Sequence, residues 1–367
     1  MLEQNQILLD KAVSINPQNS NFLTEWTQEV KTLPNVYGFF NQSGMFRDQG
    51  VSTRNFAFDK VDFGVSLLNS HFANTAAPQG VNDPQRKLFQ HTADKISTVA
   101  SIFPEDLQGH RMHGTPNSPE TLASVKADKL LQLKSSMDYT HEYMRCKAIQ
   151  GKTVNASGEV VFDSYTANGL NEADYTYELS LNDYSADIGT EIREIKRRVN
   201  NGIETGLASG RRVNFVLDDE MFDKLISHPS IKELYTYYMN SGKQQYREDI
   251  ASYYDWGIND FFEHAGITFM QYNPKFARAA DSLGGITYES MFETGSGIAV
   301  PQSVSGMFAG FFAPAGNRFD NINTMGEALY AYEWVSPKND RYELEMISCP
   351  LFLNTRPKAT IQLKTKA

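Results

Sequence analysis

Few groups of residues in this sequence have the types and spacing that chemistry requires, and the first is His110–Arg111–Met112–His113. Two imidazoles three residues apart can bind one metal ion from a single helical turn. Gly109, Gly114 and Pro116 surround them, however, and no Cys, Asp or Glu stands nearby at ligand spacing. The sequence therefore does not predict a metal site here.

Two glycine clusters and one pair of carboxylates are the next candidates. Gly284–Gly285 and Gly295–Ser296–Gly297 are followed neither by Lys–Ser/Thr nor by a helix start, so we interpret both as turns and not as phosphate-binding loops. Asp218–Asp219 has the composition of an acid–base pair. It stands between a predicted strand and a predicted helix, which favours capping of that helix.

The remaining candidates are two thiols and a group of phenols. Cys146 and Cys349 lack a nearby His and lie far apart, so we expect two buried thiols without a disulfide. A tyrosine cluster has the composition to bind a ring or a sugar, but tyrosine is also enriched at subunit interfaces, and we favour that role. The cluster consists of Tyr235, Tyr237, Tyr238, Tyr246, Tyr253 and Tyr254. We predict no catalytic, metal-binding or cofactor-binding residue and no enzyme activity.

The element around which the chain is organised is a predicted helix over residues 118–150. Ser118 is its expected N-cap, Pro119 and Glu120 favour a first turn, and Gly151 ends it. Its length would be roughly 50 Å, which suits a coiled coil or a rod across a broad, flat subunit. Charged residues dilute its apolar stripe, so we expect burial along one face only. These charged residues are Lys126, Lys129, Lys134 and Asp138, and the stripe is Leu122, Leu130, Leu133, Met137 and Met144.

Composition limits the class of protein. The chain has 367 residues, 41% of them hydrophobic, and a net charge of −10. This is enough to build one extended core or two modest ones. We expect no membrane span, no signal peptide and residence in a cytoplasm. The acidic balance argues against a surface that grips nucleic acid, so any contact with DNA should be loose.

The segments before the helix are predicted to be extended. Residues 1–35 suggest an arm with one short helix near Asn21–Lys31. Alternating apolar residues between 51 and 107 predict a long two-stranded ribbon, with a bend near Asp59–Lys60 and a loop at its tip around Gly80. An isolated ribbon is marginal in water. We therefore expect it to lie on another copy of the chain.

After the helix, the pattern predicts a hairpin and then an α/β region. Lys152–Val154 and Glu159–Phe162 flank a turn, residues 163–184 form a crossover, and a second domain begins near Ser185. Its predicted helices are those containing Ile188 to Val199, Met221 to Leu225, Ile231–Met239 and Ile258–His264, and its predicted strands are Val213–Leu217, Ile267–Tyr272, Ile298–Val300 and Met307–Phe312.

The C-terminal stretch returns to a strand pattern. Tyr342–Ile347 and Ala359–Leu363 are predicted strands, with an interruption at Cys349–Pro350–Leu351. We expect them to complete the sheet begun at Lys152, with the region near 185–335 inserted between the two parts of that domain.

This order of elements resembles the Hong Kong 97 fold of tailed-phage major capsid proteins, within the phage lambda major capsid protein (E) family. The resemblance rests on the helix running into Ala148–Thr153, the hairpin to Asp163, Gly326–Trp334, and above all Glu345–Leu351 followed by Pro357. A Ser-(small)-Pro-Leu step before the last strand is typical of the family, and Cys349 takes the small position. The resemblance implies an α+β fold and the role of a head-shell protein.

The resemblance also implies a division of the chain and a set of partners. The parts would be an N-terminal arm (1–50), an E-loop ribbon (51–110), a peripheral domain (111–184 and 336–367, with the spine helix 118–150) and an axial α/β domain (185–335). Its partners would be further copies of this chain in pentamers and hexamers, a separate scaffold protein, a portal and a decoration protein, in a virion assembled in the host cytoplasm. Some relatives form an isopeptide bond, for which Lys60, Lys87 or Lys95 would have to face Asn354; we do not expect it here.

Two alternative functions stay open at this point. An encapsulin-like compartment shares this fold and would enclose protein instead of DNA. A soluble α/β hydrolase would instead be a small oligomer with a pocket lined by carboxyl groups whose pKa is perturbed.

Overall fold

The fold is taken from a computed structural model. It describes Thr24, Glu25, Thr27, Val30 and residues 38–62, 85–107, 121–203, 211–240, 256–279 and 286–366, except 303, 305, 317–320, 322 and 339. Side chains of 55–62, 85–91, 278–279 and 286 are left aside. The predicted tip of the ribbon, including Gly80, lies outside the described residues, as does almost all of the predicted arm.

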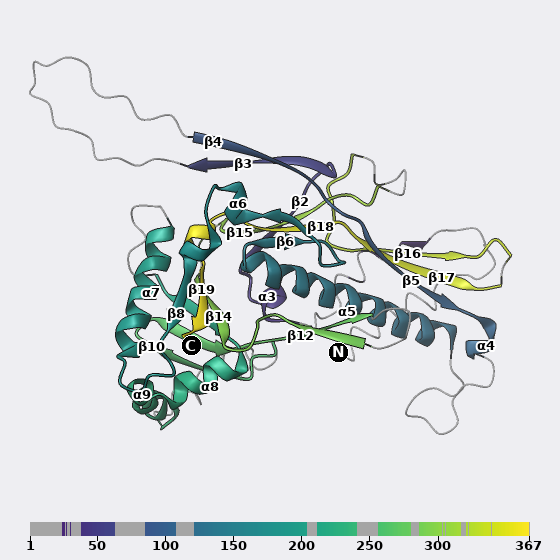
Figure 1. The fold of residues 1–367 in the computed structure, drawn as a ribbon. Coiled ribbons are helices and arrows are strands. Elements are labelled where there is room, and N and C mark those ends of the chain that lie inside the picture. Colours follow the sequence, from purple (N-terminus) through teal and green to yellow (C-terminus); the bar gives the residue numbers. More distant parts are fainter. Residues whose placement is uncertain are drawn as a thin grey trace, which may run out of the picture.

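The long helix α5 (Leu122–Ile149) lies across the molecule (Figure 1). Its N-cap is Thr121, whose side chain accepts a hydrogen bond from the Ser124 N–H. The helix thus starts later than predicted, and Ser118 is not its cap. Its 28 residues span about 42 Å. The helix stops at Gly151, whose φ of +87° and contact with the Tyr165 ring leave no room for a side chain.

Two small sheets cover α5. A four-stranded sheet has the order β1-β16-β17-β5, and a three-stranded sheet has the order β18-β15-β2. The strands are β1 (Thr24–Glu25), β2 (Phe46–Gly50), β5 (Ile96–Ile102), β15 (Phe308–Phe312), β16 (Tyr330–Val335), β17 (Tyr342–Ser348) and β18 (Pro350–Asn354), with short helices α3 (Phe39–Gln42) and α4 (Pro104–Leu107) beside them. The predicted interruption at Cys349 is confirmed, because β17 ends at Ser348 and β18 starts at Pro350.

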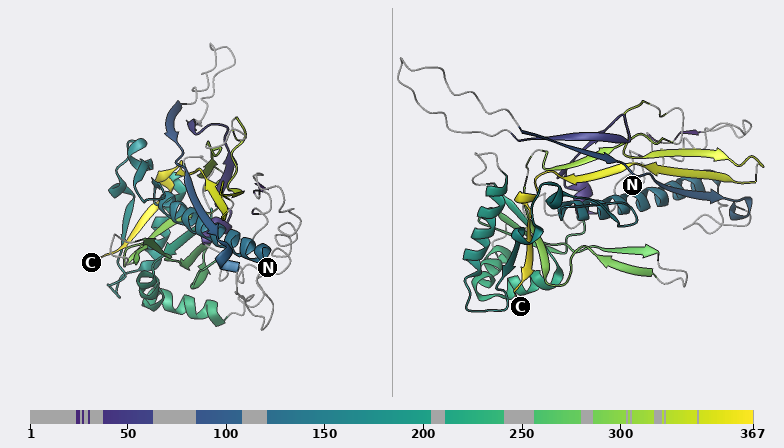
Figure 2. Two further views of the ribbon diagram at one scale, coloured as in Figure 1. Left: turned by 90° about the vertical axis from the view of Figure 1, so that its right-hand side faces the viewer. Right: turned by 45° about the horizontal axis from the view of Figure 1, so that its top comes forward.

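A six-stranded sheet stands at the C-terminal end of α5, with helices packed against it (Figures 1 and 2). Its order is β10-β11-β9-β14-β19-β8. The strands are β8 (Thr176–Leu179), β9 (Val213–Leu217), β10 (Asp260–His264), β11 (Ile267–Gln271), β14 (Ser296–Pro301) and β19 (Ile361–Thr365), and the helices are α7 (Ile188–Gly202), α8 (Asp219–Ser227) and α9 (Pro229–Asn240). Short α6 (Ser164–Ala167), η1 (Glu172–Tyr175) and η4 (Pro357–Ala359) connect the parts.

The prediction that both C-terminal strands complete the sheet begun at Lys152 was wrong. β17 pairs with β16 and β5. β19 pairs with β14 and β8 in the six-stranded sheet, and does not complete the sheet begun at Lys152. β8 also lies in this sheet, although residues 163–184 were predicted as a plain crossover. Conversely, β15 and β16 were placed in the inserted region by sequence but pair with β18 and β17 beside α5. Sheet membership depends on pairing between distant segments, which a local pattern does not specify.

The predicted helix at Ile258–His264 was also wrong, because this segment is strand β10. A two-residue turn, Ala265–Gly266, joins it to β11, and both residues have positive φ, 51° and 72°. Such turns are usually marked by Asn-Gly or Asp-Gly. With Ala in the first position, the sequence did not signal the hairpin.

The described residues also form three two-stranded sheets. They are β3 (Asn55–Asp62) with β4 (Gln85–Thr92), β6 (Lys152–Val154) with β7 (Val160–Asp163), and β12 (Lys275–Ala279) with β13 (Ile286–Ser290). The pair β3–β4, here called the ribbon, projects from one end of the molecule (Figures 1 and 2). Asn55 pairs with Thr92 and Asp62 with Gln85 in unbroken register, so no bulge interrupts the pairing at Asp59–Lys60, where a bulge or bend was predicted. The returning strand of the ribbon is thus β4, whereas β5 belongs to the four-stranded sheet.

At the N-terminal end, the prediction was right only in part. A short helix was expected near Asn21–Lys31. Thr24 and Glu25 instead form β1, which pairs with β16, whereas Thr27 and Val30 are helical and buried. In the described part of the chain, no helix is long and apolar enough to cross a membrane.

Candidate functional site

Helix α5 buries six side chains of the Lys, Arg, His, Asp and Glu types, which is the main departure from its predicted form. The six are Lys126, Lys134, Asp138, His141, Glu142 and Arg145. The prediction that α5 is buried along one face only was wrong, because three of the residues that interrupt its apolar stripe, Lys126, Lys134 and Asp138, are themselves buried. Sheets and the N-terminal segment cover α5 on several sides, so each of these side chains requires a partner inside the protein.

In the N-terminal half of α5, each buried lysine forms an ion pair with a carboxylate. Lys126 Nζ lies 2.5 Å from Glu333 Oε1 on β16 and 4.1 Å from the centre of the Tyr342 ring. Lys134 pairs with Asp138 one turn later. Burial raises the pKa of Asp138, although Lys134 and Arg145 act in the opposite direction. The Lys126–Glu333 pair holds the helix to β16, whereas the Lys134–Asp138 pair lies within the helix, and the charges of both pairs are removed from water.

His141 contacts Ser348, and this is a serine–histidine pair that the sequence did not reveal. His141 Nε2 lies 3.0 Å from Ser348 Oγ, and that hydroxyl donates to the Ala328 carbonyl at 2.7 Å. Nε2 must therefore carry the proton that lies between the two side chains. Burial, with Arg145 and Lys134 nearby, lowers the pKa of His141 to about 3. Because Ser348 is completely buried, a substrate has no path to it, and the pair serves to join α5 to β17.

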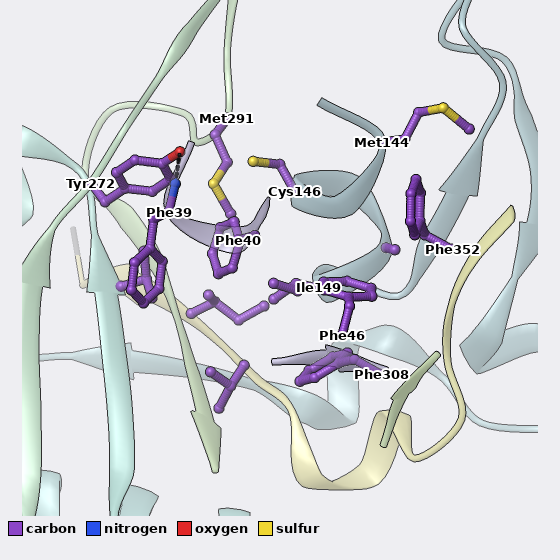
Figure 3. Close-up of a cluster of buried hydrophobic side chains, with 14 of the residues drawn as sticks. Phe39, Phe40, Phe46, Met144, Cys146, Ile149, Tyr272, Met291, Phe308 and Phe352 are labelled. Carbon is purple, nitrogen blue, oxygen red and sulfur yellow. Dashed lines mark hydrogen bonds between the residues drawn. The ribbon is translucent and has the colours of Figure 1, made fainter. Parts of the chain in front are cut away.

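Glu142 supplies the N-terminal cap that α3 lacks. The N-cap residue Gly38 makes no side-chain cap bond. Instead, the Phe40 and Asn41 N–H groups donate to the Glu142 carboxylate at 3.0 and 2.8 Å, and Tyr272 on the loop after β11 donates its hydroxyl proton to it. The Phe39 N–H donates to the same Tyr272 oxygen at 3.1 Å (Figure 3). Burial raises the pKa of Glu142, against the effect of these hydrogen bonds.

Arg145, almost one turn further along α5, binds both α3 and the strand β2 that follows it. Its guanidinium donates to Asn41 Oδ1 at 2.8 Å and to Asp48 Oδ2 at 2.7 Å. It also lies over the Phe352 ring, 4.6 Å from the ring centre. Burial raises the pKa of Asp48, while Arg145 opposes that effect. Through Asp48 on β2, helix α5 is therefore tied to the strand that leads into the ribbon.

The ribbon joins the body through a short segment, residues 50–54 together with Ala93, here called the ribbon root. Arg54 donates through Nη2 to the Ala93 carbonyl at 3.0 Å, and the Ala93 N–H donates to the Arg54 carbonyl. A Cβ on Gly50 would lie 2.2 Å from the Gly326 carbonyl oxygen. The backbone crossing at the ribbon root is thus too close for a side chain at Gly50.

An open groove of about 1370 Å³ lies between the C-terminal end of α5, the β6–β7 hairpin, β13 and the edge of the six-stranded sheet. Charged side chains line much of it, and two ion pairs, Lys147–Glu289 and Lys152–Glu172, lie along it. Val160 and Tyr288 are exposed there, by 56% and 67%. The groove offers a broad, polar contact surface and not an enclosed substrate pocket.

The carboxylate pair predicted to cap a helix does so. Asp218 is the N-cap of α8 and accepts hydrogen bonds from the Met221 N–H at 2.8 Å and the Gly295 N–H at 2.9 Å. The neighbouring Asp219 accepts a hydrogen bond from Gln271. Gly295 lies in a turn with φ of +75°, as predicted, whereas Ser296 and Gly297 already belong to strand β14. Gly284–Gly285 lies outside the described residues.

Both cysteines are buried free thiols, as predicted. Cys146 lies within the aromatic cluster of Figure 3, and burial raises its pKa well above the usual range. Burial also raises the pKa of Cys349. Neither thiol has the low pKa or the exposure of a reactive cysteine.

The tyrosine cluster is only partly covered by the described residues. Tyr235 donates to Asp260 at 2.7 Å, Tyr238 is buried and Tyr237 is 74% exposed. These three lie on α9 and do not form a pocket together. Tyr246, Tyr253 and Tyr254 lie outside the described residues, as do His110 and His113. Within the described residues, no group of three or more His, Cys, Asp or Glu side chains is placed to hold a metal ion.

Asn354, the residue considered for an isopeptide bond, is buried. Its amide donates to Thr360 Oγ1 at 3.0 Å and accepts from the Arg356 N–H. Lys95 lies near Glu345, at 3.7 Å. Lys60 and Lys87 face each other in the backbone register of the ribbon. The side chain of Asn354 is thus engaged within its own chain.

Comparison with known proteins gives a consistent result. Residues 22–365 match the model of a family described as phage major capsid protein E. The major capsid protein of Salmonella phage Felix O1 (isolate Felix O1-VT1) is 28% identical, over 94% of this chain and 96% of that protein. The major capsid protein of Pseudomonas phage KPP10 is 27% identical, over 95% and 98%. A crystal structure described as a prophage capsid protein of E. coli CFT073 superimposes with a TM-score of 0.55 at 12% identity, covering 99% of both chains.

Proposed function

The chain belongs to the phage major capsid protein E family, and from that membership we propose how its parts build a shell. It is a major capsid protein, so many copies form the shell of a phage head and the protein resides in the virion. The α+β fold is of the Hong Kong 97 type. The observation that carries this function is the family match, which extends over residues 22–365.

The copies associate as pentamers and hexamers, in rings closed by the same contact repeated around an axis. The axial part would be most of residues 185–335, and the peripheral part most of 111–184 and 336–367. Because β8 and β19 pair within the six-stranded sheet, we assign these two strands to the axial part. The arm (1–50) and the E-loop (51–110) connect neighbouring copies. The projection of the ribbon away from its own body (Figure 1) supports such a contact.

Further partners are a separate scaffold protein, a portal and a decoration protein. The DNA inside would touch the shell only loosely, since the net charge of −10 disfavours strong phosphate binding. Several weak contacts per copy make closure of the shell cooperative. Assembly takes place in the cytoplasm of the bacterial host.

The mass and shape of the purified full-length chain test this proposal. We would measure light scattering and negative-stain images for the chain alone and for the chain co-expressed with candidate scaffold proteins. Closed shells of megadalton mass, or capsomers of five or six copies, are the expected result. A species of one to four copies under every condition would overturn the proposal. DNA inside particles formed during infection separates a head shell from a compartment that encloses protein.

The ribbon is tested by replacing residues 55–92 with a short Gly-Ser linker. We expect this variant to stay folded, so that its far-ultraviolet circular dichroism spectrum lacks only the contribution of β3 and β4. It should form no closed shells. The matched control is Arg197→Ala, an exposed change on α7 that should leave the yield of shells unchanged. Normal shells from the linker variant would contradict the proposed role of the E-loop.

A further inference from the structure

The direction of the ribbon is set where the ribbon meets the body. In the described part of the chain, β3 and β4 pair with each other and with no third strand. Eight paired residues span about 26 Å at the usual rise of a strand. A tilt of about 10° at the root would therefore move the far end by about 5 Å, which is enough to misalign a contact with another copy.

The segment leading into the ribbon is held first by Glu142. The carboxylate accepts the N–H groups of Phe40 and Asn41 and the Tyr272 hydroxyl. Gly38 lies so close that an added Cβ would meet the Glu142 side chain at 2.0 Å. The start of α3 is thus fixed to α5, and through Tyr272 to the six-stranded sheet.

Arg145 holds the same segment at a second point. Its two terminal nitrogens reach Asn41 on α3 and Asp48 on β2 at the same time. Asp48 itself lies over Gly310, where a Cβ would come within 2.2 Å of Oδ1. A planar fork with two separate acceptors fixes a direction as well as a distance, which a single ammonium group does not.

We infer that Glu142 and Arg145 are positioning residues that set the angle at which the ribbon leaves the body, and thereby its fit to a neighbouring copy. Two holding points almost one helical turn apart, on one rigid helix, determine the orientation of residues 38–50. Residues 51–54 then transmit that orientation to β3 through the close crossing at Gly50. This inference rests on the proposed assembly function and assigns it two residues of α5.

The test is a distance measurement in the unassembled full-length chain. Spin labels are attached to cysteines introduced at Gln85, at the far described end of β4, and at Tyr237, which is exposed on α9. The native thiols of Cys146 and Cys349 are buried and should not be labelled. The variants are Arg145→Lys, which keeps the charge but loses the fork, and Glu142→Gln, which keeps the shape but loses one acceptor oxygen.

The matched control is Lys126→Gln, because this change removes a buried charge from the same helix without touching residues 38–50. We expect a single narrow distance distribution for the wild type and for Lys126→Gln, even where the control lowers the melting temperature. The distribution should become at least twofold broader in Arg145→Lys and Glu142→Gln, with unchanged circular dichroism. The yield of closed shells should fall at least tenfold in these two variants.

The outcomes separate this inference from the proposed function. Unchanged distance distributions in both folded variants would overturn the inference, whether or not shells form. The same broadening in Lys126→Gln would also overturn it, because general loosening of α5 would then suffice. If the wild type forms no shells while the two variants still broaden, the positioning role stands and the assembly function fails.

Discussion

Helices α5 and α7 both pack against sheets, but they bury different types of side chains. Helix α7 buries only Ile188, Ile192, Ile195 and Val199, and its ion pair Arg198–Glu194 lies about half exposed. Helix α5 buries charged groups as well, and each contacts a segment far away in the sequence or one turn away. An apolar stripe stabilises a helix on a sheet without specifying much else, whereas paired buried charges tolerate few alternative arrangements. Helix α5, to which we assign the positioning of the ribbon, thus has the more specific contacts of the two helices.

The largest effect expected from this comparison is for Lys126→Met. The change leaves the Glu333 carboxylate buried without its ammonium partner, so the free energy of unfolding should fall by about 3 to 5 kcal/mol. Urea unfolding of the unassembled chain measures it. The control is the double variant Lys126→Met/Glu333→Leu, in which both charges are replaced and most of the stability should return. If the free energy of unfolding falls by less than about 1 kcal/mol in the single variant, the buried charges of α5 do not differ from the exposed charges of α7 in their effect on stability.

On α7, the corresponding change is Ile195→Ala. Removing this fully buried side chain should lower the free energy of unfolding by about 2 to 4 kcal/mol through lost apolar contact and a cavity. This loss should not depend on salt concentration in the same urea experiment, because no charge is removed. Arg197→Ala on the exposed side of α7 is the control and should stay within about 0.5 kcal/mol. An equally small effect at Ile195 would remove the distinction between the two sides of α7.

The pH dependence of stability sharpens the same contrast. Below about pH 6.5 an unfolded histidine takes up a proton, whereas folded His141 does so only near pH 3. The stability contributed by neutral His141 is therefore complete above pH 6.5 and is lost as the pH falls toward 3. Relative to His141→Gln, the wild type should lose about 1.4 kcal/mol per pH unit between pH 6 and 4.

That difference between wild type and variant is the quantity to measure, by urea unfolding at several pH values. The raised pKa values of Glu142, Asp138 and Asp48 act in the opposite direction, because their folded forms bind protons more readily. They are common to both proteins, so the comparison removes them. Parallel stability curves for the two proteins would show that His141 is not held neutral.

The smallest effect is expected for Arg198→Met on α7. Its ion pair with Glu194 is half exposed, so its loss should cost about 0.3 to 0.5 kcal/mol at low salt and less at high salt. Thermal unfolding at two salt concentrations measures this. A loss as large as that of Lys126→Met would mean that burial is not what distinguishes the charges of the two helices.

Part of the candidate site was within reach of the sequence. A long helix, a ribbon before it, two inert thiols and a helix-capping role for Asp218 were all predicted, and the structure contains them. Glu142 and Arg145 were not singled out. Charged residues on a helix normally face water, so the sequence contained little sign that those of α5 are buried. The one hint was the number of charged residues that interrupt its apolar stripe.

The sequence by itself determined the elements whose signals are local. Helix α7, strand β9, the hairpin at Lys152–Asp163 and the break at Cys349 follow from apolar periodicity, turn residues and proline, each acting within a few positions. Only the tertiary structure decided which sheet receives β8 and β19, and which charges of α5 are buried. Lys126 and Glu333 are 207 positions apart, and pairing across such a distance depends on the whole fold, because burial of a charge is tolerated only where its partner arrives.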